Sequence, residues 1–212
     1  MNTVLQIALS NPETKTTKRN NMRTVVAPIG GAGNHVRWLC LLDKSFDLKP
    51  ISKTSATNFE FILNTVYNEK RNNDNWLEIE FIWRENLVHL IDLYNDIEFI
   101  KDFDNKKFLY VCSPGEKCYE HYFKFSKKNK KYQDRMHENK EQWIKEVDTQ
   151  NDNITTLLPN PFILHFGKYY TENIDEKLLD QLNGFFNINI PYAEADIVHK
   201  RWIELNSTKR ST

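Results

Sequence analysis

The strongest candidate for chemistry in this chain is a glycine-rich turn, PIGGAGNHV at residues 28–36. Gly30, Gly31 and Gly33 carry no side chain, so the backbone of the bend can take a positive φ and an anion can approach its amides. If a helix begins at Gly33 or Asn34, the free amides of its first turn and its dipole point toward the same place. Phosphate or sulfate is the ligand that such an arrangement favours. The pattern therefore predicts an anion site at this turn.

The turn departs from the two best-known nucleotide-binding motifs. A nucleotide-hydrolysing P-loop places Lys and Ser or Thr after its last glycine, where this chain has Asn34 and His35. The dinucleotide-binding frame needs a third glycine where this chain has Val36. In a purely structural alternative, the glycines only turn a strand into a helix, Asn34 caps that helix and His35 is exposed. The place of the turn favours a ligand, because open α/β sheets bind ligands at the C-terminal ends of their strands.

Short apolar runs and helical periodicity predict the elements that position the turn. Strands are expected at residues 23–29, at 106–112 and within 160–170, and helices from Asn34 onward, within 52–69, from about 116 to 127, within 174–188 and over 192–206. The stretch 76–96 alternates like a strand at first, but Leu87 and Leu90 fit a helix, so we expect it to be mostly helical. The charged stretch 127–153 suits an exposed helix or a mobile lid.

Strands separated by helices of a dozen or more residues favour a parallel sheet covered on both faces, since parallel strands need long crossovers. We therefore expect an α/β fold with three layers: a mainly parallel sheet flanked by helices, opening on a P-loop-like strand, turn and helix. A single domain is expected over residues 22–206, because a chain of 212 residues buries one substantial core. Residues 1–21 are polar and turn-prone, which predicts a flexible leader, and residues 207–212 form a polar tail.

Charge and cysteine content narrow the class of protein. Lysine plus arginine equal aspartate plus glutamate at 29 each, so no overall field attracts nucleic acid or an acidic membrane. Cys40, Cys112 and Cys118 lie among apolar residues without the paired spacing of a zinc site, as buried free thiols in a reducing compartment do. No apolar run is long enough for a signal peptide or a membrane span. We expect a soluble, cytoplasmic protein with no nucleic-acid or membrane partner.

Three blocks of the sequence resemble the P-loop sulfotransferases in their order and spacing. VVAPIGGAGNHVRWLCLLD is similar to the first strand and 5′-phosphosulfate loop of that family, and KKFLYVCSPGEKCYEHYFKF is similar to its next phosphate-binding strand, turn and aromatic helix. NPFILHFGKYYTENIDEKLLDQLNGFFNINI resembles its late strand, acidic loop and helix. The resemblance implies transfer of a sulfuryl group from 3′-phosphoadenylyl sulfate to a small-molecule or saccharide acceptor.

The resemblance also implies roles for residues of the turn. Gly33, Asn34 and His35 match the Gly-Thr-Thr part of the family's first loop. Together with Gly30 and Gly31 they are the expected contacts of the donor's phosphate and sulfate groups.

Two departures from the family pattern concern charge. The family's arginine for the 3′-phosphate falls at or beside Ser113, and its later serine falls near Glu120, whose carboxylate would repel a phosphate. The basic residue of the first loop is also missing. We expect Ser113 among the donor contacts, and Arg37 or Lys168 to supply the missing positive charge.

Sulfuryl transfer needs a base for the acceptor proton and donors for the oxygens of the migrating group. We expect His35 to hydrogen-bond the leaving phosphate or to act as the base. His89 and His165 are the alternative bases, and His165 is favoured because it lies near the end of an expected strand. His121, His137 and His199 are expected on helix surfaces. No two histidines stand four residues apart with a third ligand nearby, so no metal site is expected.

Two other functions remain open. Gly-Ala-Gly-Asn-His also resembles the Gly-x-Gly-Asn turn of some fucosyltransferase-like enzymes, which implies a nucleotide-sugar donor. The second is a degenerate, non-catalytic binding or assembly protein, which would also lack the functional residues that are missing from the sulfotransferase pattern here. Ligand binding separates the three hypotheses, because each expects a different ligand or none.

Overall fold

The structure, a computed structural model, describes residues 22–28, 30–46, 57–66, 87–90, 106–128, 139–166 and 173–206. The leader expected at 1–21, the tail expected at 207–212 and the candidates Lys168 and His137 lie outside the described residues.

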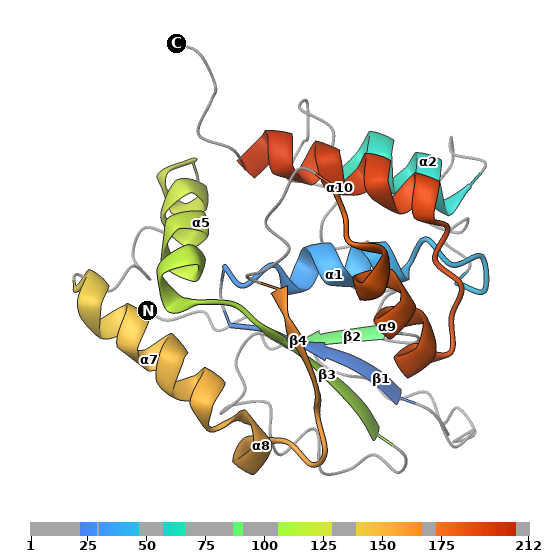
Figure 1. The fold of residues 1–212 in the computed structure, drawn as a ribbon. Coiled ribbons are helices and arrows are strands. Elements are labelled where there is room, and N and C mark those ends of the chain that lie inside the picture. The colour runs from blue at the N-terminus through green and yellow to red at the C-terminus, as the bar shows by residue number, and fades with distance from the viewer. Residues whose placement is uncertain are drawn as a thin grey trace, which may run out of the picture.

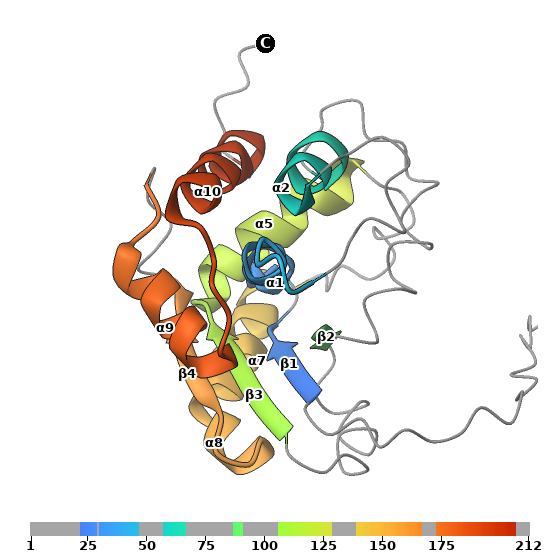
Figure 2. The ribbon, with the colours of Figure 1, turned by 90° about the vertical axis from the view of Figure 1, so that its right-hand side faces the viewer.

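Four parallel strands form the described part of the sheet, in the order β2-β1-β3-β4 (Figure 2). Their bounds are β1 Met22–Val26, β2 Leu87–Leu90, β3 Lys106–Cys112 and β4 Phe162–His165. In the register of the sheet, Val25 stands opposite Leu109, which in turn stands opposite Phe162. Parallel neighbours require crossover connections, and helices supply them here. The α/β class and the mainly parallel sheet flanked by helices are therefore confirmed.

The helices lie between and after these strands (Figure 1). Their bounds are α1 Gly33–Cys40, α2 Asn58–Phe61 with its continuation as a π-helix η1 Ile62–Val66, α5 Gly115–Lys128, α7 Lys140–Asp152, α8 Ile154–Leu157, α9 Glu176–Phe186 and α10 Tyr192–Asn206. Asp175 caps α9 by accepting a hydrogen bond from the amide of Lys177 at 2.8 Å. The helices expected at about 116–127, within 174–188 and over 192–206 are confirmed. Among these described helices, none combines the length and apolar character needed to cross a membrane.

Strand residues alternate between two apolar faces of the sheet. On one face Val25, Leu109 and Leu164 pack with residues of α1, α9 and α10. On the other face Val26 and Tyr110 pack with residues that include those of α8. Figure 1 shows α1, α9 and α10 on one side of the sheet and α7 and α8 on the other. This alternation with a period of two is what a sheet covered on both faces requires.

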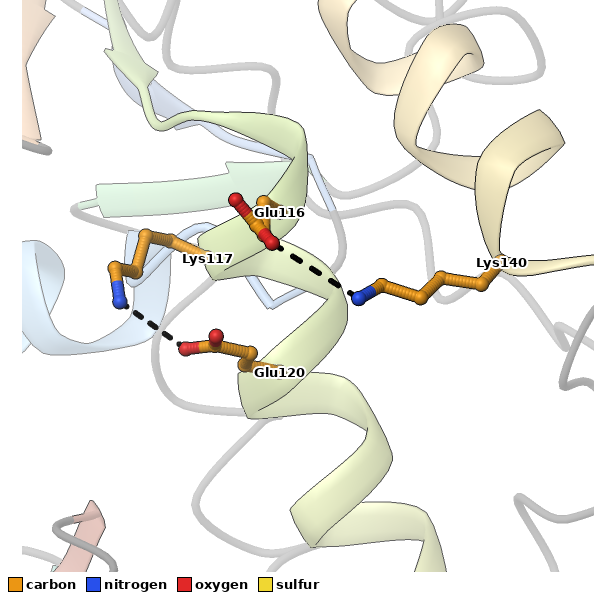
Figure 3. Close-up of polar contacts among 4 residues, drawn as sticks. All are labelled: Glu116, Lys117, Glu120 and Lys140. Atoms are coloured by element: carbon orange, nitrogen blue, oxygen red, sulfur yellow. Dashed lines mark hydrogen bonds and ion pairs between the residues drawn. The ribbon is translucent and has the colours of Figure 1, made fainter.

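Helices α5 and α7 pack against each other through a small apolar cluster, formed by Cys118, Tyr122, Trp143 and Val147. The rings of Tyr122 and Trp143 are stacked, with their centroids 6.0 Å apart. Lys140 of α7 also reaches Glu116 of α5 at 3.9 Å (Figure 3). Both charged groups are largely exposed, so this ion pair adds little and the apolar contact holds the helices together. The helix expected within 127–153 is confirmed as α7, with Trp143 as its buried anchor.

The expectation of a mostly helical stretch at 76–96 is wrong for Leu87–Leu90, which forms β2. The remainder of that stretch lies outside the described residues. The spacing of three between Leu87 and Leu90 resembles a helical repeat, and four residues are too few to separate the two periods. Pairing beside β1, with Val88 opposite Thr24, outweighs local propensity here.

The three cysteines are free thiols. Cys40 and Cys118 are buried as expected, and Cys112 is partly buried. Burial raises the pKa of all three thiols, that of Cys118 to about 12, and the carboxylate of Asp148 adds to the rise at Cys112 and Cys118. Neutral thiols are weak nucleophiles, so these cysteines serve as small apolar residues of the core.

Replacing Gly30 with alanine tests the tightest corner of the fold. Gly30 has a φ of +81°, and a Cβ there would stand 2.1 Å from the carbonyl oxygen of Cys118. We expect Gly30→Ala to lower the free energy of unfolding by about 1–3 kcal/mol through backbone strain alone, with the overlap adding to that loss. Chemical denaturation measures the change.

Gly184→Ala is the matched control. No described atom outside its own helix lies within 4 Å of the Cβ that this substitution would add inside α9. We expect it to raise the free energy of unfolding by about 0.5–1 kcal/mol, since alanine is the better helix former. Equal effects of the two substitutions would contradict the close contact at Gly30.

Candidate anion-binding site

The strand order places the glycine turn where the chain changes direction across the sheet. From β1 the chain continues to β2 on one side, and β3 then lies on the other side of β1. The glycine turn follows β1, and the turn at residues 113–115 follows β3, so both leave the sheet at the same edge. Open parallel sheets bind ligands where two such turns diverge.

The glycine turn leads into α1 without a side-chain cap. Gly30 and Ala32 both take left-handed conformations, with φ of 81° and 63°, and the amide of Gly31 donates to the carbonyl of Pro28 at 2.8 Å. The helix begins at Gly33 as expected; Ala32 is its N-cap, and the methyl side chain of that residue accepts no hydrogen bond. The first turn of α1 contains no acidic residue. The amides that open α1 therefore point out of its N-terminal end together with the positive end of its dipole.

Two contacts fix the shape of the glycine turn, one with the first turn of α5 and one with the β3–α5 turn. Gly30 lies against the backbone of Cys118, as the 2.1 Å approach of an added Cβ to its carbonyl oxygen indicates. The hydroxyl of Ser113 donates to the carbonyl of Gly31 at 3.0 Å, and this contact is buried. The predicted binding residues Gly30, Gly31 and Ser113 are thus brought together, with the hydroxyl hydrogen of Ser113 committed to the turn itself.

Two side chains of helix α7 make hydrogen bonds with backbone groups of the β3–α5 turn. The Oδ1 of Asp148 accepts from the amide of Gly115, the first residue of α5, at 2.9 Å. The Nδ2 of Asn151 donates to the carbonyl of Ser113, also at 2.9 Å. A carboxylate of the protein therefore occupies the positive end of α5, close to the place that the resemblance gives to a donor's 3′-phosphate.

Asn34 and Arg37 meet along the first turn of α1. The Nη2 of Arg37 donates to the Oδ1 of Asn34 at 2.9 Å. Asn34 is exposed, whereas Arg37 has only 6% of its surface exposed. The guanidinium therefore reaches back toward the N-terminal end of the helix, and it adds positive charge at the same end as the amides that open the helix.

The side chain of His35 lies inside the protein among other rings. It is 1% exposed, and its Nε2 lies 3.0 Å from the Nδ1 of His199 in α10. Trp202 stacks on its ring at a centroid distance of 4.4 Å, and Phe166 meets the ring edge-on at 6.0 Å. Burial holds the pKa of His35 well below its ordinary value, and the nearby His199 and His121 lower it further. The imidazole is therefore neutral at pH 7.

Two sequence expectations are wrong at this cluster. The sequence predicts His199 on a helix surface, but the residue is fully buried because it lies on the inner face of α10 and its ring meets that of His35. The structural alternative for the turn predicts Asn34 as the N-cap and His35 as exposed. The N-cap is instead Ala32, and His35 is buried.

His165 lies at the same edge of the sheet but apart from His35. It ends β4 opposite Cys112, and its side chain is exposed. Its neighbours Leu164 and Phe166 belong to the core on the α1 side, so strand alternation turns His165 toward the other face. Two strand spacings, about 10 Å, separate β4 from β1. The structure does not bring the two predicted catalytic histidines together.

Sequence reasoning missed two residues that shape the site, His199 and Asp148. A signal for His199 exists, because it shares the buried face of α10 with Ala195, Val198 and Trp202 at spacings of three and four. No sequence signal marks Asp148, since α7 meets the start of α5 only through tertiary packing.

No protein-family model, no curated protein and no solved structure matches the chain.

Ser113→Ala tests the brace on the glycine turn. We expect the free energy of unfolding to fall by about 1–3 kcal/mol, because the substitution takes away the donor to the buried carbonyl of Gly31. Thr155→Ala removes a hydroxyl from an exposed position in α8 and should change stability by less than about 0.5 kcal/mol. Urea denaturation of both variants measures the difference, and equal losses would show that the brace contributes nothing of its own.

Proposed function

We propose that this protein is a sulfotransferase-like transferase, which binds the phosphate- or sulfate-bearing part of a nucleotide donor at residues 30–35. The proposed donor is 3′-phosphoadenylyl sulfate, and the proposed acceptor is a small molecule or saccharide. In this proposal the fold has three layers, and β1, the glycine turn and α1 form its P-loop-like unit. The observation that carries the proposal is the start of α1, which lacks a side-chain cap and has the guanidinium of Arg37 nearby.

Three contributions favour an anion at the start of α1. Its first amides have no partners within the helix, and hydrogen bonds to a charged ligand contribute about 1.5–3 kcal/mol each. The helix dipole adds about 0.3–1 kcal/mol near an exposed terminus. Arg37 adds a full positive charge along the same helical turn. Since α1 has no acid in its first turn, no carboxylate of that turn competes with a ligand.

The proposed chemistry assigns separate tasks to the start of α1 and to His165. The acceptor oxygen attacks sulfur while the bond from sulfur to the nucleotide phosphate breaks, and a base takes the acceptor proton. The amides of Gly33 and Asn34 stabilise the charge that develops on the leaving phosphate. His165 is the proposed base because its side chain is exposed; since β4 lies two strands from β1, about 10 Å, this role requires the acceptor to reach from the glycine turn to the end of β4. His35 is enclosed, and we assign it to holding α1 in place.

A nucleotide-sugar transferase is the second candidate, and the β3–α5 turn favours it. Asp148 takes the amide of Gly115, and Glu116 lies in the first turn of α5. Glu120 follows one turn later, paired with Lys117 at 3.1 Å (Figure 3). Each like charge 4 Å from a 3′-phosphate costs about 1 kcal/mol in water. A nucleotide sugar has no 3′-phosphate and therefore avoids this repulsion.

A panel of donors followed by thermal unfolding tests these candidates. We expect adenosine 3′,5′-bisphosphate at millimolar concentration to raise Tm, because a ligand at 100 times its Kd adds about 2.7 kcal/mol to the free energy of unfolding. A shift with GDP sugars but none with the bisphosphate would select the nucleotide-sugar candidate. No shift with either would reject donor binding and leave a non-catalytic protein, with which the enclosed His35 also agrees.

Asn34→Asp tests whether the anion lies at the start of α1. The substitution keeps an oxygen for Arg37 and places a carboxylate where the helix dipole tolerates it, so the fold should be kept. The new charge repels a bound anion by about 1–4 kcal/mol at 4 Å, which predicts at least about a fivefold loss of affinity for the bisphosphate. Titration calorimetry measures the affinity.

Asn139→Asp is the control for that charge. Asn139 caps α7, and its Oδ1 accepts from the amides of Glu141 and Gln142 at 3.0 and 3.2 Å. The substitution therefore adds the same charge at another helix N-terminus, and the affinity should not change. Equal effects of Asn34→Asp and Asn139→Asp would place the ligand away from α1.

A further inference from the structure

A cluster of five rings joins α1 to α10, which pack on the same side of the sheet (Figure 1). We call it the imidazole cluster; its members are His35 of α1, His121 of α5, Phe166 after β4, and His199 and Trp202 of α10. The centroids of His35 and His199 are 5.2 Å apart, and His121 meets Trp202 edge-on at 5.5 Å. His35 and His199 have 1% or less of their surface exposed. The first turn of α1 thus meets α10 through a buried polar pair.

The contact between these two histidines depends on their protons. The Nε2 of His35 lies 3.0 Å from the Nδ1 of His199, which requires one nitrogen to donate and the other to accept. Two neutral imidazoles meet that requirement, and so does a pair that carries one added proton. Two imidazolium rings cannot, because both facing nitrogens then carry hydrogen.

The surroundings of His35 disfavour its protonation. Among the described residues, His199 from α10 and His121 from α5 act on the charge of His35; both are bases, and the other rings of the cluster are uncharged. On α1 itself, Arg37 is positive. Burial first, and then the two histidines, keep the pKa of His35 well below its ordinary value of 6.5. In acid, His35 therefore binds a proton more readily in the unfolded chain than in the folded protein. The free energy of unfolding consequently falls as the pH drops below about 6.5.

We propose that His199 is a positioning residue for the anion site: its Nδ1 holds His35, and with it the first turn of α1, until acid releases that hold. The inference rests on the proposed function, because it concerns the amides that would bind the donor. His199 acts through His35, which follows Asn34 directly in the chain. Amides stabilise an anion by their fixed geometry, so a loosened first turn binds it less tightly.

Two substitutions at His199 separate its hydrogen bond from its packing. In His199→Asn the amide group stands near the place of the ring Nδ1, so it keeps a non-titrating partner for the Nε2 of His35, whereas His199→Ala removes the contact at that position. At pH 8 we expect His199→Ala to bind adenosine 3′,5′-bisphosphate about tenfold more weakly than the wild type, and His199→Asn to stay within about threefold. Ile197→Ala, on the exposed side of the same helix, should bind like the wild type.

A ligand-free experiment tests the release by acid. Amide hydrogen exchange in residues 33–40 and 192–206 is measured at pH 8 and pH 5.5, and protection factors remove the intrinsic effect of pH on exchange. We expect wild-type protection in α1 to fall by up to about tenfold per pH unit below 6.5 for each proton taken up. His199→Asn should lose less, because it has one titrating group fewer. Ligand binding is measured at pH 8 alone, since phosphate itself titrates near pH 6.

The binding measurement and the exchange measurement can each reject a different part of the proposal. If the wild type and His199→Ala bind the bisphosphate equally, His199 does not position the site. If His199→Asn loses as much protection in acid as the wild type, the release by acid is rejected. If His199→Ala does not fold, the comparison of the wild type with His199→Asn still decides the exchange measurement. If the wild type binds no donor, the proposed function is rejected, and the positioning role of His199 is rejected with it. The exchange measurement then still shows whether His199 stabilises the first turn of α1.

Discussion

The close approach of Gly30 to the carbonyl of Cys118 determines how the rest of the site is built. Two backbones meet there with no room for a side chain, because β1 and β3 are neighbours and their turns leave the same edge of the sheet. The positive φ of Gly30 lets the chain pass this point, and the hydrogen bond from Ser113 to Gly31 fixes the turn beyond it. The start of α1 follows within three residues. The direction of the first amides of α1 is therefore set by the backbone contact at Gly30 and not by a side chain of the glycine turn.

Two helix starts at this edge of the sheet differ in how their amides are satisfied. At α5 the carboxylate of Asp148 accepts from the first amide, which stabilises that helix in the way an N-cap does. At α1 the N-cap is Ala32, which gives up about 1 kcal/mol relative to a capping side chain. Natural sequences break a local rule of this kind mainly at functional or strained sites. The contrast explains why the proposed anion site belongs at α1 and why a second phosphate at α5 would have to displace a carboxylate of the protein.

The sequence predicts those parts of the fold whose signal is local. Strand 106–112 and helix 192–206 match the structure because a short apolar run and a long periodic pattern each suffice to define them. Leu87–Leu90 is too short for the spacing of its apolar residues to distinguish a helix from a strand. Pairing with β1 determines its conformation. The glycine turn and its helix start could be read from the residues, whereas the brace from Ser113, the carboxylate of Asp148 and the burial of His199 depend on contacts between elements far apart in the chain.

The imidazole pair is an unusual choice for a contact between two packed helices. Two apolar side chains of similar size would bury as much surface without the need to satisfy polar nitrogens, so stability alone does not explain His35 and His199. A hydrogen bond differs from an apolar contact in being directional, and it fixes the rotation of one helix relative to another more narrowly. On the proposed function that direction matters, because the amides at the start of α1 act only from a fixed position. The stacked ring of Trp202 limits the rotation of His35 as well. The turn after the first strand thereby depends on the last helix of the described chain, and the lowered pKa of His35 follows from the same burial that makes the pair rigid.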